Sequence, residues 1–346
     1  LASITEATAH YRTLAQTSPA VHLPHLASAL NNLAIQQNAN GDRQAALDSA
    51  TQAVEIRRTL AQANPAVHLP GFASALNNLS NHESETGKHE AALASVTEAV
   101  GHYRTLAQAS PAVHLPDLAG ALNNLSLQQN ANGDRQAALD SATEAVGHYR
   151  TLAQTSPAAH LPHLASALNN LSVQLRANGD RQAALDSATE AVGHYRTLAQ
   201  ANPAAHLPDL AGTLNNLSNH QSGTGEREAA LASITEAVRH YRALAQASPS
   251  VHVSGLAGAL NNLSLQQNAN GDRQAALDSA AEAVEIRRTL AQANPAAHLP
   301  HLAGTLNNLS IQQNANGDRQ AALDSVTEAV GHYRTLARAA PAAHLP

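Results

Sequence analysis

The tetrapeptide Leu30-Asn31-Asn32-Leu33 recurs along the chain at a constant interval of 46 residues. The later copies begin at Leu76, Leu122, Leu168, Leu214, Leu260 and Leu306. Self-similarity at a fixed period of this size is typical of solenoids, in which each unit packs mainly against its neighbours. Fold and function must therefore be sought in one repeat and in the differences among its copies.

The first half of each repeat predicts an amphipathic helix. In the first copy, Leu26, Leu30 and Leu33 are spaced by four and three residues, which places them on one helical face. Pro24 suits the opening turn, because its missing N–H costs nothing there. This helix is therefore expected to run from about Pro24 to Ala39, after a loop between repeats.

The second half predicts another helix, packed antiparallel to the first. Asn40-Gly41 supplies a left-handed stop, Asp42 can cap the second helix, and Asn64-Pro65 ends it. Small and aliphatic residues recur on its expected inner side: Ala46, Leu47, Ala50, Ala53, Val54, Leu60 and Ala61. One hairpin cannot bury these stripes alone, so successive hairpins are expected to stack closely.

The chain is interpreted as one continuous solenoid of helical hairpins. Residues 1–24 form a partial repeat, and the full repeats are 25–70, 71–116, 117–162, 163–208, 209–254, 255–300 and 301–346. The sequence contains no Met. It is therefore expected to be a window from a longer array.

Three segments resemble the long tetratricopeptide repeats of the kinesin-light-chain type. They are Pro-Asp-Leu-Ala-Gly-Ala-Leu-Asn-Asn-Leu at 116–125, Gly-Lys-His-Glu-Ala-Ala at 87–92 and Ala-Val-Glu-Ile-Arg at 53–57. The resemblance covers the whole chain and implies an all-α, right-handed superhelix, with first helices lining its concave groove. The loop between repeats is expected to be longer than in that family. The abundance of Ala, and of Arg in place of Lys, suits a bacterial source.

Composition argues against several functions. The net charge is -6, Lys88 is the only lysine, and aromatic residues make up 2% of the chain, so nucleic-acid binding is not expected. No apolar run approaches the length of a membrane span, and a cytoplasmic location is expected. The period leaves no unique nucleophile–base set and no phosphate-binding glycine loop, so neither enzyme activity nor a cofactor is expected.

The paired asparagines are the main functional candidates. A rotation of about 100° per residue from Leu30 puts the second asparagine, Asn32, on the side away from the core. The resemblance then places the Asn32 series in the groove, where each amide could bind the backbone of an extended peptide. The candidate peptide-binding residues are Asn32, Asn78, Asn124, Asn170, Asn216, Asn262 and Asn308. The alternative is that both asparagines bond to neighbouring helices and only fix the stack.

Ligand selectivity is expected to come from a variable position three residues further on. These candidate residues are Ile35, Asn81, Leu127, Val173, Asn219, Leu265 and Ile311. The first helices contain no Lys and only Arg176, so a clamp for a peptide C-terminus is not expected.

Other recurring polar residues predict structural roles. Tyr residues on the second helices should pack between repeats, and their replacement by Arg57 and Arg287 predicts an edge position, because burying an arginine is costly. Ser254 replaces the entry proline and is expected to be an N-cap. One histidine per repeat is expected in the loop before the first helix: His22, His68, His114, His160, His206, His252, His298 and His344.

No metal site is expected, because histidines in neighbouring repeats lie too far apart to share an ion. The densest group of potential ligands is His82, Glu83, Glu85 and His89. A charged turn explains this group as well as an incidental metal site does.

The leading hypothesis is a protein-interaction scaffold that binds an extended peptide or a partner helix in its concave groove. One alternative is a structural array that self-associates end to end, because solenoids normally need polar terminal repeats. Another is a regulatory or sensor region of a larger NTPase or protease-like protein.

Overall fold

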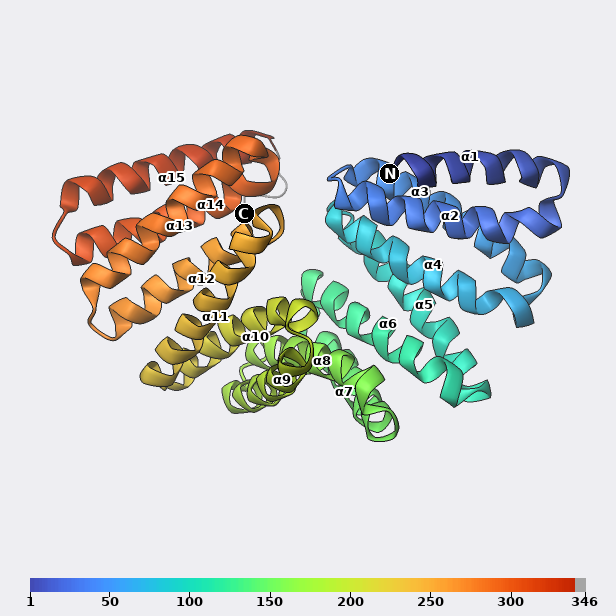
Figure 1. Cartoon of the computed structure of the whole chain (residues 1–346), viewed down its shortest axis with the longest axis horizontal. Coiled ribbons are helices and arrows are strands. Elements are labelled where there is room, and N and C mark those ends of the chain that lie inside the picture. The colour runs from blue at the N-terminus through green and yellow to red at the C-terminus, as the bar shows by residue number, and fades with distance from the viewer. Residues whose placement is uncertain (340–346) are drawn as a thin grey trace. The chain divides into compact units, whose positions relative to one another are not determined.

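A computed structural model of the chain describes residues 1–339, and every regular element in them is an α-helix (Figure 1). The first helices of the repeats are α2 (Pro19–Ala39), α4 (Pro65–Glu85), α6 (Pro111–Ala131), α8 (Pro157–Ala177), α10 (Pro203–Thr224), α12 (Pro249–Ala269) and α14 (Pro295–Ala315). The second helices are α1 (Ala2–Thr17), α3 (Arg43–Ala63), α5 (His89–Ala109), α7 (Arg135–Thr155), α9 (Arg181–Ala201), α11 (Arg227–Ala247), α13 (Arg273–Ala293) and α15 (Arg319–Ala339). The predicted all-α repeat fold is confirmed.

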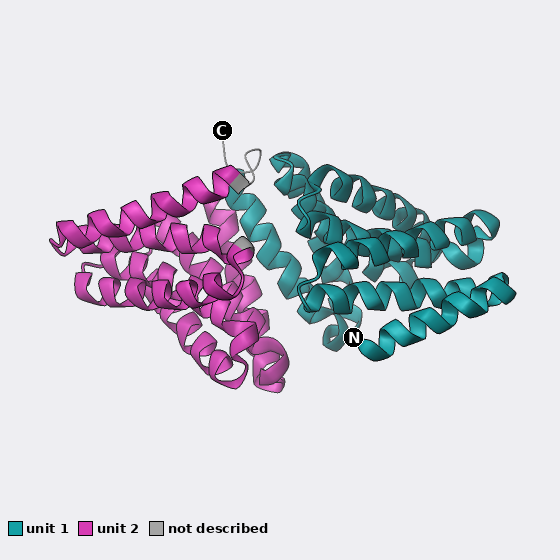
Figure 2. Ribbon diagram, turned by 90° about the horizontal axis from the view of Figure 1, so that it is seen from above, with its two compact units in different colours: residues 1–178 teal, residues 179–346 magenta. Residues whose placement is uncertain are grey.

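The chain divides into two compact units, residues 1–178 and residues 179–346 (Figure 2). Unit 1 contains α1 to α8, and unit 2 contains α9 to α15. Within each unit, every helix packs against the helices before and after it. None of the described helices combines the length and the apolar composition that crossing a bilayer requires. The end of the predicted seventh repeat, residues 340–346, lies outside the described residues.

The junction between repeats differs from the prediction. Helix α2 begins at Pro19 and is separated from α1 by Ser18 alone, so the predicted start at Pro24 and the long loop are wrong. Pro19 takes the first helical position, and Pro24 lies inside the helix, where it removes one backbone hydrogen bond to Ala20. The additional helical turn lets Leu23 pack against the core, which offsets that loss.

The histidines of the junction are therefore helical. His22 is the fourth residue of α2, and the equivalent histidines of the later first helices lie at the same place, not in loops. They are His68, His114, His160, His206, His252 and His298. His344 lies outside the described residues.

Two further predictions fail at a buried arginine. Ser254 lies within α12 and is not an N-cap; its hydroxyl accepts a hydrogen bond from Nη1 of Arg287 at 3.0 Å. Arg287 is only 8% exposed, and burial lowers the pKa of its guanidinium, so it does not take the predicted edge position. In the first repeat, Arg57 is half-buried, bonds to the hydroxyl of Ser28 and fills the space that a side chain at Gly71 would need. Gly71 thus leaves space for the side chain of Arg57, and serine hydroxyls accept hydrogen bonds from both guanidinium groups.

The turn within each hairpin agrees with the prediction. Gly41 has a φ of 85°, in the left-handed region that favours glycine, and it follows Asn40, the C-cap of α2, which ends at Ala39. Asp42 then caps α3, because its carboxylate accepts a hydrogen bond from the backbone N–H of Ala45 at 3.2 Å. The same cap recurs at Asp134, Asp180, Asp272 and Asp318.

The core consists of leucines separated by alanines. The first leucine of each Leu-Asn-Asn-Leu copy is fully buried, and all seven residues predicted for the inner side of α3 are buried. Ala73, Ala119 and Ala165 are completely buried on the first helices, where a larger side chain would push the helices apart.

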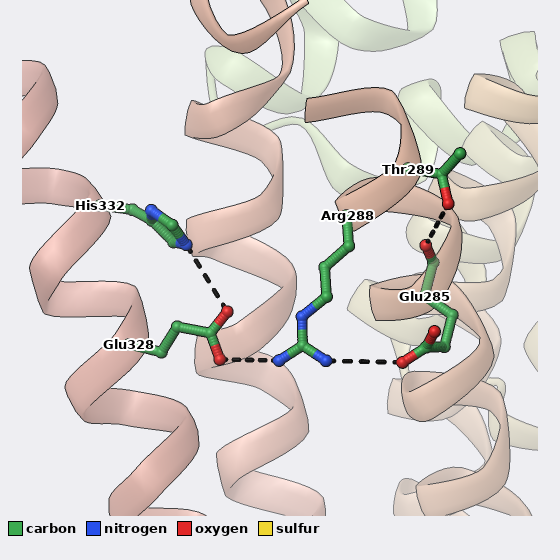
Figure 3. Close-up of polar contacts among 5 residues, drawn as sticks. All are labelled: Glu285, Arg288, Thr289, Glu328 and His332. Atoms are coloured by element: carbon green, nitrogen blue, oxygen red, sulfur yellow. Dashed lines mark hydrogen bonds and ion pairs between the residues drawn. The ribbon is translucent and has the colours of Figure 1, made fainter. Parts of the chain in front are cut away.

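The two layers of helices are spaced differently. Within the units, α2 approaches α4, α4 approaches α6, and α12 approaches both α10 and α14, whereas among the described residues no second helix comes as close to the next second helix. The first helices therefore form the narrower, inner layer of each unit. The second helices are linked by long side chains, as between Arg288 and Glu328, whose charged groups lie 2.7 Å apart (Figure 3).

The same link recurs along the second helices. Arginine and glutamate are separated by 40 residues in each pair, so every pair joins consecutive repeats. Further pairs within the two units are Arg58 with Glu98, Arg104 with Glu144, Arg196 with Glu236 and Arg242 with Glu282.

The core predicts the effect of truncating one leucine. Leu122 is 0% exposed, so Leu122→Ala should lower the free energy of unfolding by about 2–5 kcal/mol. Leu127 lies on the same helix and is 40% exposed, so Leu127→Ala should change it by less than about 1 kcal/mol. Urea unfolding of both variants would check this, and equal losses would contradict the packing described here.

Candidate ligand-binding groove

The asparagines of the inner layer form a side-chain ladder within each unit. Nδ2 of the second asparagine in one repeat donates a hydrogen bond to Oδ1 of the first asparagine in the preceding repeat. Unit 1 contains the pairs Asn78 with Asn31 at 2.9 Å, Asn124 with Asn77 at 3.0 Å and Asn170 with Asn123 at 3.0 Å. Unit 2 contains Asn262 with Asn215 and Asn308 with Asn261, both at 2.9 Å. The asparagines therefore do bond to neighbouring helices, as the alternative interpretation proposed.

Each ladder bond uses only part of two amides. In the pair Asn124 and Asn77, the bond occupies one N–H of Asn124 and Oδ1 of Asn77. Oδ1 of Asn124 and Nδ2 of Asn77 make no hydrogen bond to another described residue. Both side chains are half-buried, so these groups lie at the surface of the inner layer. An acceptor and a donor are thus left for a ligand in each such pair.

The predicted peptide-binding and selectivity positions lie on the same helices. Asn32 is exposed, and the other six members of its series are half-buried. Three positions later, the apolar members of the variable series are exposed: Ile35, Leu127, Val173, Leu265 and Ile311. The polar members, Asn81 and Asn219, are half-buried. A row of amides therefore runs beside a row of exposed apolar side chains.

One pocket of about 350 Å³ lies in this surface, between α2, α4 and α6 of unit 1. It brings together the predicted peptide-binding Asn78 and the predicted selectivity residues Ile35 and Asn81. Its other lining residues are Asn38, His82, Ser84, Glu85 and Gln128.

A neighbouring pocket of about 400 Å³ is lined by Asn32 and Ile35, together with Gln36 and residues of α1. In each of two successive repeats, the predicted peptide-binding asparagine and the predicted selectivity residue therefore line the same pocket: Asn32 and Ile35 in one, Asn78 and Asn81 in the other.

Five residues of the first pocket were not predicted as site residues: Asn38, His82, Ser84, Glu85 and Gln128. His82 and Gln128 are 6% and 5% exposed. The sequence did contain a signal for two of these residues. Most repeats have Gln-Gln-Asn-Ala at this point, and the second repeat replaces the first glutamine by His82 and the alanine by Glu85.

The electrostatics of this pocket depend on Glu85. One of its carboxylate oxygens accepts a hydrogen bond from Nδ2 of Asn38 at 3.2 Å. The other lies 3.7 Å from Nδ1 of His82, longer than a hydrogen bond. Burial lowers the pKa of His82, and the negative charge of Glu85 opposes this effect only in part. His82 is therefore neutral near pH 7, and Glu85 supplies the charge of the pocket.

The other glutamate of the charged sequence cluster has a different partner. Glu83 accepts a hydrogen bond from the hydroxyl of Ser95 at 2.7 Å, which joins the two helices of its own hairpin. Among residues 1–339, no three potential ligand side chains gather as a metal site would require.

The environment of His82 predicts a pH effect on stability. Because its pKa is lower in the folded chain than the ordinary value of 6.5, the unfolded chain binds more protons as the pH falls below about 6.5. Stability should therefore decline on acidification from there toward the folded-state pKa. His82→Gln installs the residue found at five equivalent positions and should make this decline shallower. Urea unfolding between about pH 7.5 and 5 measures the slope, and an unchanged slope would contradict a buried neutral His82.

Comparison with solved structures places the fold among tetratricopeptide-type proteins. The crystal structure of BtubC (BKLC) from P. vanneervenii matches with a TM-score of 0.57 and 21% identity, over 70% of this chain and 90% of that chain. A Podosopora anserina putative kinesin light chain with nearly identical TPR-like repeats matches with a TM-score of 0.50 and 21% identity, over 64% and 98%. The Rap conjugation gene regulator of plasmid pLS20, in complex with the Phr* peptide, matches with a TM-score of 0.59 and 14% identity, over 93% and 77%.

No protein-family model and no curated protein sequence matches the chain. The resemblance to kinesin-light-chain-type tetratricopeptide repeats, first noted in the sequence, is therefore confirmed at the level of the fold: the chain is built from TPR-like helical hairpins in regular repeats.

Proposed function

We propose that this chain is a protein-interaction scaffold that binds an extended peptide across the first helices of its repeats. The second asparagine of each Leu-Asn-Asn-Leu copy would hold the peptide backbone. The observation that carries the proposal is the row of partly free amides beside exposed apolar residues. Oδ1 of Asn124 illustrates it, since it makes no hydrogen bond to another described residue and lies at the surface three residues before Leu127.

The spacing of the ladder suits an extended chain. Adjacent helices pack roughly 8–10 Å apart, and an extended peptide rises about 3.3 Å per residue. Successive asparagines would then meet the peptide backbone about every third residue. The side chains between these contacts would reach the variable positions. A proline-free backbone offers both N–H and C=O groups, which match the free acceptor and donor of each asparagine pair.

The structural comparison supports this type of ligand. The pLS20 Rap regulator, whose fold is similar, was solved in complex with a peptide. Exposed apolar side chains such as Ile35 and Leu127 on the inner layer are also typical of surfaces that bind partners.

Replacing three second asparagines of unit 1 tests the proposal. Peptides would first be selected from a random dodecapeptide display library on the wild-type chain, and their affinity measured by fluorescence anisotropy. The triple variant with Ala at Asn78, Asn124 and Asn170 should bind them on the order of 100-fold more weakly, from about 1 kcal/mol for each lost hydrogen bond.

A matched control has Ala at Asn31, Asn77 and Asn123. It removes the same three ladder bonds, so both variants should lose a similar unfolding free energy, about 3 kcal/mol in total. Only the first variant removes the free Oδ1 groups, whereas the control removes the free Nδ2 groups of the first asparagines. The first variant should lose more peptide binding than the control, and equal loss in both would contradict a binding role specific to the second asparagine.

A further inference from the structure

We propose that the pocket between α2, α4 and α6 binds a cationic side chain, arginine or lysine, of the peptide that the groove accepts. This inference rests on the proposed function and assigns a ligand chemistry to one of its subsites. It arises from the hydrogen-bonding groups that line the pocket around Glu85.

The pocket combines a negative charge with unused acceptors. Glu85 bonds through one oxygen to Asn38, and its second oxygen has no hydrogen bond within 3.5 Å among the described residues. Asn78 donates its amide to Asn31, which leaves its Oδ1 without a partner in the described chain. A guanidinium or ammonium group carries only donors, so it matches this set.

A buried amide, that of Gln128, also lines the pocket. Gln128 is 5% exposed, and its Oε1 has no hydrogen-bond partner among the described residues. An unsatisfied buried acceptor is costly, and a cationic donor would relieve that cost. Gln128 lines the pocket that such a donor would enter.

The remaining walls suit a long side chain with a charged end. Ile35 is 48% exposed and lines the pocket, where it can cover the aliphatic stem of arginine or lysine. The volume of about 350 Å³ lies within the usual range of small-ligand sites. The lining residues include no Lys or Arg, and His82 is neutral near pH 7, so a ligand cation meets no like charge among them.

The subsite is specific to the second repeat. The residues equivalent to Glu85 in the other repeats are Ala39, Ala131, Ala177, Gly223, Ala269 and Ala315. The carboxylate therefore has no role in the common repeat, and Glu85→Ala restores the residue that most copies contain. This variant should fold normally, which makes it a clean test.

The test uses the same random dodecapeptide library on three forms of the whole chain. Wild type should enrich Arg or Lys at one peptide position. Glu85→Ala should abolish that enrichment, and peptides selected on wild type should bind it about tenfold more weakly, because a charge-assisted contact is lost. Glu85→Lys should enrich Asp or Glu at the same position.

Glu83→Gln is the matched control. It removes a negative charge two residues away on the same helix, and Gln at this position retains the bond to the hairpin serine, as Gln37 does with Ser49 at 2.8 Å. The control should keep the cationic preference, and its loss there would overturn the assignment to Glu85.

The outcomes separate this inference from the proposed function. The inference would be overturned if the selected peptides showed no preference for Arg or Lys at any position. It would also be overturned if Glu85→Ala left such a preference unchanged. Either result would leave the proposed backbone binding intact. Failure to enrich any peptide would overturn the proposed function, and the subsite with it.

Discussion

The short reach of the asparagine side chain constrains how the first helices can be spaced. A bond such as that between Asn124 and Asn77 closes only if two consecutive first helices approach closely, and fully buried alanines such as Ala119 permit that approach. The second helices are linked instead by arginine and glutamate, whose longer side chains span a wider gap. A short link on one layer and a long link on the other bend each unit toward its first helices.

Under the proposed function, the same asparagine bonds join stability to binding. A side chain that served a ligand alone could be removed without affecting the fold, and one that only fixed the stack would present nothing to a ligand. Under the proposed function Asn124 would do both, because its N–H is used within the chain and its oxygen is not. The half-burial of these amides also holds them in place before a peptide arrives, which lowers the entropy cost of binding.

Local rules predicted the features that one repeat determines by itself. The spacing of Leu26, Leu30 and Leu33, the left-handed Gly41 and the capping Asp42 all follow from short-range geometry, and all are confirmed. The start of the first helix could not be predicted in this way, because Pro19 and Pro24 both suit an opening turn. Packing of the additional turn decides between them, and packing depends on the preceding repeat.

The pocket was beyond prediction for a related reason. Its residues come from three successive repeats, so their meeting depends on the register that the asparagine bonds set. In a periodic chain, a residue that recurs in every repeat is most simply explained by packing between repeats. A residue that occurs in one repeat alone needs a separate explanation. Glu85 is such a departure, since it adds a charge where the other copies have alanine or glycine. A charge that the repeat does not need, placed beside unused acceptors, is most economically explained by a ligand that carries the opposite charge.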